Sequence, residues 1–406
     1  MRRHYQSQRV YSVAEQGFTL RILICPNAFK GSLSASRAAR IISDAIAAVI
    51  PGADLDICPL ADGGDGTLET LVTATGGTVR PVPVHDALMR PIQAEWGLLG
   101  DQRTAVIEMA RAAGLAQLNS NELAPDKATT YGVGELIKQA AATGCSRMII
   151  GIGGSATNDG GSGALSALGA RFLDGDGRVL EQGGLALQKL YEVDISGLEP
   201  YRHLKLMVAC DVTNPLLGAE GASVVYGPQK GAGSEMIEKL DAALQRFAEV
   251  TARITGFDMA SLPGAGAAGG LGAGLAAYLG AGLEPGWQVV ARAVQLEKRM
   301  AKSDLVITGE GKIDLQSGFG KVVGAVGRLA LSVGRPVIAL SGVVDVDIET
   351  LNRWGIAAAF SIMHVPYSLP EAMANAETLL SAASRNMAQA LRLGHEIGPS
   401  LENPLL

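Results

Sequence analysis

Acidic residues and glycines occur together at several points where a short apolar run of this chain ends. Ala61–Thr67 (ADGGDGT) places two carboxylates, Asp62 and Asp65, three residues apart in a glycine-rich turn. Carboxylates in such a turn can hold Mg²⁺ or accept a proton from a hydroxyl group. Asp65 could equally cap a helix predicted over the following residues. The two interpretations are compatible, and Asp62 is a predicted metal ligand.

The densest segment of this kind is Gly153–Gly163, which follows the apolar run 147–153. Glycines there would expose backbone N–H groups to phosphate oxygens, and hydroxyl and amide side chains would add donors. The predicted phosphate contacts are Gly153, Gly154, Ser155 and Asn158, with Lys230 of a later loop as their charge partner. Asp159 of the same segment is the second predicted metal ligand.

Two further apolar runs end in an acid. The run 205–211 (KLMVACD) ends in Asp211 within a polar loop, which makes Asp211 the preferred base for a substrate hydroxyl. On local grounds Asp211 could as readily cap a turn before Pro215. The run 304–310 leads into Glu310, Asp314 and Lys321. Asp314 is the second candidate base, and the other two are predicted nucleotide contacts.

A lysine stands beside a predicted helix start in Asn27–Ser32. There Lys30 could bind a substrate carboxylate or the transferring phosphate, or it could be a solvated lysine next to an ordinary cap. Phosphoryl transfer needs N–H groups and lysines for phosphates, carboxylates for Mg²⁺ and an acid that orients the attacking hydroxyl. The five loops together contain that inventory. No G-x-x-x-x-G-K-[ST] segment occurs, which excludes a P-loop enzyme.

Two other classes of function compete with a kinase. Gly151, Gly153 and Ala156 match the loose dinucleotide fingerprint, with Asp174 about twenty residues on. That pattern would fit an NAD(P)-dependent oxidoreductase, although Thr157–Gly161 is a poor first helical turn, where the fingerprint needs a helix. A small-anion binding protein with the same loops would bind its ligand without turnover. The acids beside the phosphate-type loops favour the kinase over both.

These loops need a scaffold that brings strand ends together. Six short runs are nearly all apolar, as expected for parallel strands covered by helices on both faces: 21–26, 147–153, 205–211, 304–310, 336–342 and 358–363. Helical periodicity occurs between them, at 34–50 and 130–143. The alternation predicts an α/β fold with a doubly wound, mostly parallel, Rossmann-like sheet. Ligands of such sheets bind beyond the carboxyl ends of the strands.

With 406 residues the chain exceeds one comfortable hydrophobic core, so two domains are expected. Residues 78–110 contain three strand-like runs without a helix between them, which indicates an antiparallel meander. We predict a second, smaller α/β domain inserted into the first, with the active site in the cleft between them. The predicted division is 21–60, 127–260 and 297–400 for the Rossmann-like domain, 61–126 and 261–296 for the second, and 1–20 as an N-terminal extension.

The composition limits the partners and the location. The net charge is −6 and no Lys/Arg cluster could neutralise a run of phosphates, which excludes a nucleic-acid partner. The N-terminus lacks an apolar signal-peptide core, and the uncharged stretch 263–283 is too rich in glycine for a membrane span. Four scattered cysteines predict reduced thiols in a cytoplasmic protein rather than a zinc site.

Nine segments, in this order, resemble the bacterial glycerate kinase family, type one. They are FKGSLSA, ADGGDGT, IEMA followed by AGL, TTYGVGELI, GGSATNDGG, CDVTNPLLG, GPQKGA, PGAGAAGGLG and DLVITGEGKID. The resemblance runs from about residue 21 to residue 390, and GGSATNDGG, GPQKGA and ITGEG are long and distinctive. The chain departs from the usual family pattern at Asn27, Lys127 and Ser317.

The resemblance implies a function, cofactors and a fold. Members of the family phosphorylate D-glycerate with ATP and Mg²⁺, commonly at the 2-hydroxyl, which would give 2-phosphoglycerate and ADP. Phosphorylation at the 3-hydroxyl or of another small hydroxy acid is the alternative within this class. The family fold is described as a Rossmann-like α/β domain with a second α/β domain, in agreement with the division above. The sequence allows a homodimer and does not fix the oligomeric state.

Overall fold

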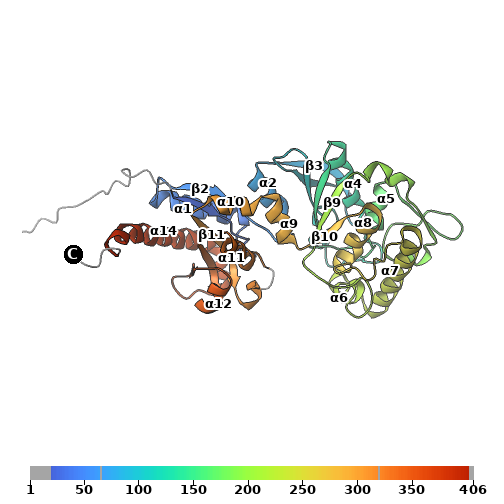
Figure 1. Cartoon of the computed structure of the whole chain (residues 1–406). Helices are drawn as coiled ribbons and strands as arrows, with labels where there is room; N and C mark the ends of the chain where they lie inside the picture. Colours follow the sequence, from blue (N-terminus) through green and yellow to red (C-terminus); the bar gives the residue numbers. More distant parts are fainter. Residues whose placement is uncertain (1–19, 65, 319–320, 402–406) are drawn as a thin grey trace, which may run out of the picture.

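The computed structural model describes residues 20–64, 66–318 and 321–401. Residues 1–19 of the predicted N-terminal extension lie outside this range, as does Asp65 of the predicted acidic turn. Figure 1 shows two lobes side by side, with α2 (Thr67–Thr75) and α9 (Gly286–Ala293) between them. Each lobe is built on one β-sheet, so the fold is α/β in both.

The first sheet is entirely parallel, in the order β13-β12-β11-β1-β2. Its strands are β1 (Arg21–Ile24), β2 (Asp54–Ile57), β11 (Leu305–Ile313), β12 (Val337–Val344) and β13 (Ala358–Ser361). Four of the five were predicted from their apolar runs. The sequence analysis missed β2 (DLDI), because its two aspartates hide the strand pattern.

The second sheet has six strands in the order β10-β9-β6-β5-β4-β3. Its strands are β3 (Thr78–His85), β4 (Pro91–Leu98), β5 (Thr104–Glu108), β6 (Arg147–Gly151), β9 (Lys205–Ala209) and β10 (Gly282–Glu284). The first three form the predicted antiparallel meander, and the rest add in parallel to β5. A separate hairpin pairs β7 (Arg171–Leu173) with β8 (Glu192–Asp194).

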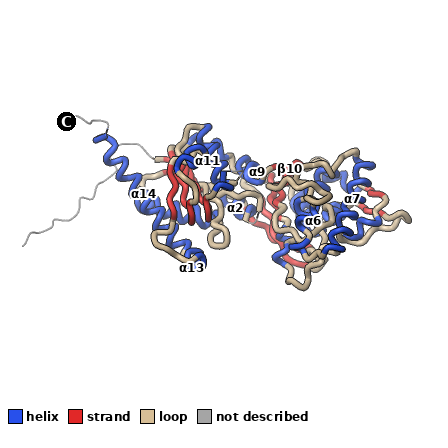
Figure 2. Tube along the Cα trace, turned by 90° about the horizontal axis from the view of Figure 1, so that it is seen from below, coloured by secondary structure: helices blue, strands red, loops and turns tan. Residues whose placement is uncertain are grey.

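Helices cover both faces of each sheet, as Figure 2 shows from below. The remaining helices are α1 (Ala35–Val49), α3 (Ala110–Ala113), α4 (Tyr131–Ala142), α5 (Ser162–Ala167), α6 (Ala222–Tyr226), α7 (Ser234–Thr255), α8 (Leu271–Leu279), α10 (Leu296–Lys302), α11 (Val322–Ser332), α12 (Ile348–Arg353), α13 (Leu369–Ala374) and α14 (Ala376–Leu401). The helices predicted over 34–50 and 130–143 are confirmed as α1 and α4. Ser34 caps α1 by accepting the Arg37 N–H.

Alternate residues of each strand enter different cores, because successive side chains point to opposite faces. In β1, Ile22 and Ile24 pack with α1 and α14, whereas Leu23 packs toward α10 and α11. In the second sheet, Ile150 packs with α4, α5 and α8, whereas Ile149 joins the same core as Leu23. That shared core contains α2 and α9, so these helices form one apolar layer between the two sheets.

The two sheets group the strands differently from the predicted division. The prediction places 127–260 with β1, but β6 and β9 pair with β5 in the second sheet. The inserted part of the chain, between β2 and β11, also carries the larger sheet rather than a smaller one. An apolar run indicates a buried parallel strand without specifying its neighbour, since all such strands have the same composition.

Among the described residues, no helix has both the length and the apolar character that crossing a membrane requires. The uncharged stretch 263–283 folds instead into a short turn of 3₁₀-helix (Ala267–Gly270), α8 and the start of β10. Its first part packs against the backbone of Thr157–Gly160, and Gly160 N–H donates to Gly269 O at 2.8 Å. This glycine-rich segment therefore supports the Gly153–Gly163 loop from behind.

Candidate active site

The carboxyl ends of both sheets face one cleft of about 700 Å³. We refer to it as the carboxyl-edge cleft; its lining includes Asp62, Asp211, Thr213, Trp287, Gln288 and Lys321. Asp62 follows β2 of the first sheet, Asp211 follows β9 of the second, and Lys321 precedes α11. Three of the loops singled out in the sequence therefore converge here, at the edge where ligands bind in open α/β sheets.

The segment Asp62–Gly64 joins the two sheets physically. Gly63 leaves no room for a side chain, since a Cβ there would lie 2.7 Å from Ala209 Cβ at the end of β9. A Cβ on Gly151, at the end of β6, would in turn lie 2.8 Å from Gly63 O. The glycines that suggested a phosphate loop thus also let the turn after β2 lie across the strand ends of the second sheet.

Asp211 is held by the first residue of α9. The Gly286 N–H donates to Asp211 Oδ1 at 2.7 Å, so the carboxylate lies at the amino end of that helix. Burial raises the pKa of Asp211 to about 6, the Gly286 hydrogen bond opposes the shift, and the charge of Asp62 adds to it. A carboxylate at the surface of the cleft whose pKa is raised to about 6 suits a general base.

Glu310 and Ser317 form a buried pair at the first-sheet side. The Ser317 hydroxyl donates to Glu310 Oε1 at 2.6 Å. Burial raises the pKa of Glu310; the Ser317 bond and Lys321 oppose this shift, and the charges of Asp314 and Asp62 add to it. Glu310 therefore lies within electrostatic reach of the cleft, and Ser317 fixes its orientation.

Asp314 is less suited to act as a base. Its carboxylate lies 3.5 Å from Lys312 Nζ and 4.0 Å from Lys321 Nζ. Burial opposes ionisation of Asp314, but Lys321, the Gln316 N–H and Lys312 outweigh it and hold the pKa of Asp314 below its usual range. A carboxylate kept ionised by two lysines is a weak proton acceptor.

Lys30 lies near the same edge. Its backbone N would be 3.4 Å from a Cβ placed on Gly311, the residue after Glu310, and its side chain is exposed. The Asn27 N–H donates to Gly309 O at 2.8 Å, which ties this loop to β11. The backbone of Lys30 is thus close to Gly311, the residue after Glu310.

The Gly153–Gly163 loop divides into an exposed and a buried part. Gly153 and Gly154 are exposed beyond β6, and a Cβ on Gly153 would lie 3.2 Å from Gly64 Cα of the acidic turn. Ser155 is mostly buried and pairs in a β-bridge with Gly114. Only the two glycines of the predicted phosphate contacts are therefore open to a ligand next to the acidic turn.

Asp159, a predicted metal ligand, does not line the carboxyl-edge cleft in this structure, and metal binding by Asp159 stays a prediction. Asp159 is fully buried and accepts hydrogen bonds from the N–H groups of Thr130, Gly161 and Gly163 and from the hydroxyls of Thr129 and Thr130. Burial raises the pKa of Asp159 and these donors oppose the shift. The carboxylate connects the loop to the start of α4, a structural role that its sequence neighbours do not reveal.

The Asp159→Asn change is expected to lower the free energy of unfolding by about 2–3 kcal/mol, because hydrogen bonds to a buried charged acceptor are among the stronger ones. Urea denaturation measures this. The matched control is Asp174→Asn, whose carboxylate accepts two N–H groups in a turn and should cost about 1 kcal/mol or less. Unchanged stability with lost activity would support Asp159 as a metal ligand.

Asn158 and Lys230 are also buried rather than placed in the cleft. The Asn158 amide donates to the Ser223 hydroxyl at 3.0 Å, and Lys230 Nζ donates to Thr157 O at 2.6 Å. Burial lowers the pKa of Lys230 to about 7, and the charge of Asp159 opposes the shift. Neither side chain lines the carboxyl-edge cleft in this structure, and their contact with a phosphate stays a prediction. Lys230 supports the loop from inside.

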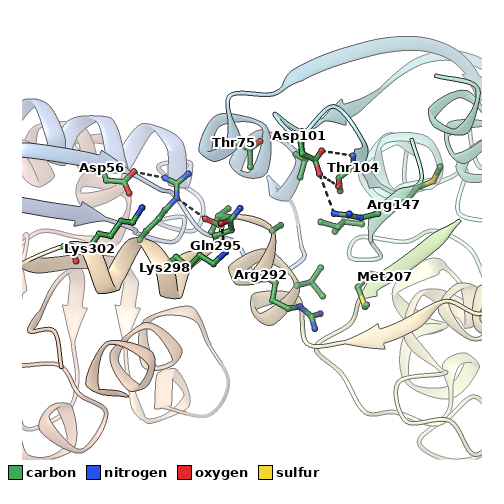
Figure 3. Close-up of a pocket in the computed structure, with 18 of the residues that line it drawn as sticks. Asp56, Thr75, Asp101, Thr104, Arg147, Met207, Arg292, Gln295, Lys298 and Lys302 are labelled. Atoms are coloured by element: carbon green, nitrogen blue, oxygen red, sulfur yellow. Dashed lines mark hydrogen bonds and ion pairs between the residues drawn. The ribbon is translucent and has the colours of Figure 1, made fainter. Parts of the chain in front are cut away.

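A larger groove, of about 1150 Å³, lies at the opposite edge of both sheets (Figure 3). It includes the first residues of five strands: Arg21, Asp54, Thr104, Arg147 and Lys205. Four of its arginines already hold carboxylates, in the pairs Arg21–Asp304, Arg147–Asp101, Arg292–Glu284 and Arg299–Asp56. Its position at the amino ends of the strands does not suit a phosphate-transfer site.

The dinucleotide alternative does not fit the geometry. The segment Thr157–Gly161 is not helical, and α5 begins only at Ser162. Asp174 uses its carboxylate to accept the N–H groups of Asp176 and Arg178 in its own turn. The pyrophosphate of a dinucleotide needs a helix N-terminus directly after the glycines, which is absent from this described segment.

Three residues of the site have no role in the sequence analysis. Glu108 at the end of β5, Arg111 beyond it and Gly286 at the start of α9 all contact the acidic turn, its helix α2, or Asp211. A signal existed for each. Glu108 is an acid at a strand end, Arg111 follows three residues later, and Gly286 follows a proline at a helix start.

The chain is similar to known proteins of one family over nearly its whole length. The profile of the glycerate kinase family matches residues 22–392. A glycerate 2-kinase from Escherichia coli K12 is 44% identical over 376 residues, covering 92% of this chain and 99% of the relative. A glycerate kinase from Bacillus subtilis 168 is also 44% identical, with 92% and 98% covered. The crystal structure of a protein from Salmonella typhimurium LT2, assigned as glycerate kinase 2, matches with a TM-score of 0.85 at 46% identity, covering 93% and 100%.

Proposed function

The chain belongs to the glycerate kinase family, and we propose that it transfers the γ-phosphoryl group of ATP to glycerate in the carboxyl-edge cleft. The observation that carries this placement is the meeting of Asp62, Asp211 and Lys321 in one cleft at the carboxyl ends of both sheets. Carboxylates and a lysine that face one space supply what phosphoryl transfer needs. The enzyme is therefore a phosphotransferase with an alcohol group as acceptor.

Asp211 is the proposed base. With its pKa raised to about 6 it is ionised at neutral pH, yet basic enough to take the proton as the hydroxyl attacks. The Gly286 N–H fixes one carboxylate oxygen and leaves the other for the substrate. The attacking hydroxyl of glycerate would lie against that free oxygen.

Mg²⁺ is the proposed metal, and Asp62 is its proposed protein ligand. Among the residues that the structure describes, no group of three or more His, Cys, Asp or Glu is arranged to hold a metal unaided. Mg²⁺ at nucleotide sites is typically held by one or two carboxylates, phosphate oxygens and water, so the exposed carboxylate of Asp62 fits. The ion would neutralise charge on the phosphates as they react.

The cations and N–H groups around the cleft have proposed roles toward the two substrates. Lys321 and the backbone N–H groups of Gly153 and Gly154 would contact phosphate oxygens, because all three are next to the Asp62 turn or in the cleft. Lys30 would bind the glycerate carboxylate. The negative charge of Glu310 would attract the Lys321 ammonium group and so orient the lysine.

The proposed product is 2-phosphoglycerate. ³¹P NMR of the purified protein with ATP, Mg²⁺ and D-glycerate tests this directly. A new phosphomonoester resonance at the position of authentic 2-phosphoglycerate is the expected result. A resonance at the 3-phosphoglycerate position would keep the kinase and overturn the regiochemistry. The absence of any glycerate-dependent product, from folded protein, would overturn the proposed function.

The kcat/KM for MgATP is expected to fall by about tenfold for each pH unit below about 6. The base must be deprotonated, and Asp211, whose pKa is raised, becomes protonated in that range. A coupled assay of ADP release from pH 5 to 8 measures this acidic limb of the pH profile. The Asp211→Asn variant, assayed at high enzyme concentration, should lack it. A wild-type limb centred near pH 4 would contradict the assignment.

We also propose a cytoplasmic location, which the thiols support, since the four cysteines are all free. A homodimer stays a prediction.

A further inference from the structure

Glu108 is a buried carboxylate at the carboxyl end of β5, and it reaches out of its own sheet. Its side chain is 7% exposed. One oxygen, Oε1, accepts a hydrogen bond from the Leu68 N–H in α2 at 2.8 Å. The other, Oε2, accepts a hydrogen bond from Arg111 Nε at 3.0 Å. Both oxygens are thus engaged, one with a helix that follows the acidic turn and one with a cation.

Arg111 adds a second link to the same helix. Its guanidinium bonds to Glu108, to Glu95 of β4 at 3.1 Å and to Glu69 in the first turn of α2. Two independent contacts, at Leu68 and at Glu69, therefore attach the first turn of α2 to the second sheet.

The N-cap residue of α2 has no side chain to hold the start of the helix. Its N-cap is Gly66, with a left-handed φ of 86° and no side chain that could accept a helix N–H. The first N–H groups of a helix have no partner within the helix and attract negative charge. The carboxylate of Glu108, from a distant part of the sequence, supplies an acceptor to the first turn of this helix.

The turn that carries Asp62 is tied to this helix start. The Thr67 hydroxyl donates to Gly64 O at 2.7 Å, and the Gly64 N–H donates to Asp62 Oδ1 at 3.3 Å. Any shift of the first turn of α2 therefore moves the backbone next to Asp62. Asp62–Gly64 has little room to relax elsewhere, because its backbone already packs on Ala209, Gly151 and Gly286.

We propose that Glu108 and Arg111 are a positioning pair that holds the Asp62 turn against the strand ends of the second sheet and so fixes Asp62 opposite Asp211. The pair touches neither substrate; it acts through α2. The inference rests on the proposed role of Asp62 in the function above. It gives Glu108 of the IEMA segment, to which the sequence analysis assigned no chemical role, a task in positioning the site.

The test is a double-mutant cycle of Glu108→Gln with Asp62→Asn. Glu108→Gln should lower kcat/KM for MgATP by about tenfold to a hundredfold, because displacement by about 1 Å can cost that much. In the Asp62→Asn background the same change should cost less than about threefold, since the group it positions is already gone. If Glu108 had only a general structural role, Glu108→Gln would instead lower kcat/KM by the same factor in the wild-type and Asp62→Asn backgrounds.

Hydrogen exchange gives a readout that does not depend on activity. The amides of the Asp62–Leu68 segment should exchange faster in Glu108→Gln, while those of β12 keep their wild-type rates. Arg111→Lys keeps the positive charge but loses the planar guanidinium that contacts three carboxylates. It should show the same non-additivity with Asp62→Asn. If Glu108→Gln does not fold, Arg111→Lys takes its place in the cycle. Glu122→Gln removes a carboxylate from another arginine, Arg90, and is the matched control with wild-type behaviour.

Two outcomes separate this inference from the proposed function. Full activity of Asp62→Asn would overturn the role of Asp62, and the positioning role with it. Reduced but measurable activity of Asp62→Asn with additive losses in the double variant, or unchanged exchange of the Asp62–Leu68 segment, would overturn the positioning pair alone.

Discussion

The Asp211→Asn variant is expected to lose about a hundredfold to ten-thousandfold in kcat, the usual contribution of a positioned general base. The amide keeps the shape of the side chain and can still accept the Gly286 N–H, so the fold and the α9 start should remain intact. It cannot accept the proton of the attacking hydroxyl. ³¹P NMR or a coupled ADP assay at saturating ATP and glycerate measures the loss, and urea denaturation shows that the variant is folded.

Asp314→Asn is the matched control, since it makes the same chemical change in a neighbouring loop. Its carboxylate is engaged by Lys312 and Lys321, and ion pairs of this partly exposed kind contribute about 0–1 kcal/mol. The loss in kcat should stay within about fivefold. The reverse pattern, with Asp211→Asn active and Asp314→Asn inactive, would move the base to Asp314.

Gly286→Ala is expected to lower kcat by about a hundredfold, the second large effect. A Cβ at this position would overlap the backbone oxygen of Asp62, so either the Asp62 turn or the start of α9 must move. The first movement displaces Asp62, and the second displaces the N–H that holds Asp211. A shift of about 1 Å in a catalytic group can cost that factor. Overpacking should also lower the free energy of unfolding by about 1–3 kcal/mol.

Gly282→Ala separates the close approach from a general effect of adding a methyl group. Gly282 begins β10, four residues earlier, and a Cβ there would meet only the flexible end of Met207, at 3.3 Å. It should keep wild-type kcat within about threefold. If Gly286→Ala keeps wild-type kcat in an assay where Asp211→Asn is inactive, the contact between Gly286 and Asp62 has no part in placing the site.

The sequence predicted much of the fold because burial leaves a local record. A strand covered on both faces is almost continuously apolar, and six such runs correspond to β1, β6, β9, β11, β12 and β13. The antiparallel meander of β3, β4 and β5 was likewise readable from its short breaks. The pairing partners of the individual strands could not be predicted from the sequence. Every buried strand looks alike, so the sequence did not indicate that β6 and β9 pair beside β5 rather than beside β1.

The candidate site divides in the same way. Residue types and strand-end positions identified Asp62, Asp211, Glu310 and Lys321 in the loops that line or adjoin the cleft. They could not distinguish Gly153 and Gly154, which are exposed, from Asn158 and Asp159, which are fully buried. A run of nine polar and small residues has no periodicity that tells which side chains turn inward.

The sequence by itself determined the chemistry available to this protein: carboxylates, lysines and glycine turns at strand ends, in an order typical of the glycerate kinase family. Tertiary structure alone decided which of them act together. Asp62 and Asp211 are 149 positions apart by their numbers and meet because two glycines, Gly63 and Gly286, allow backbones to touch. Such proximity depends on the packing of whole sheets, which no local sequence pattern encodes.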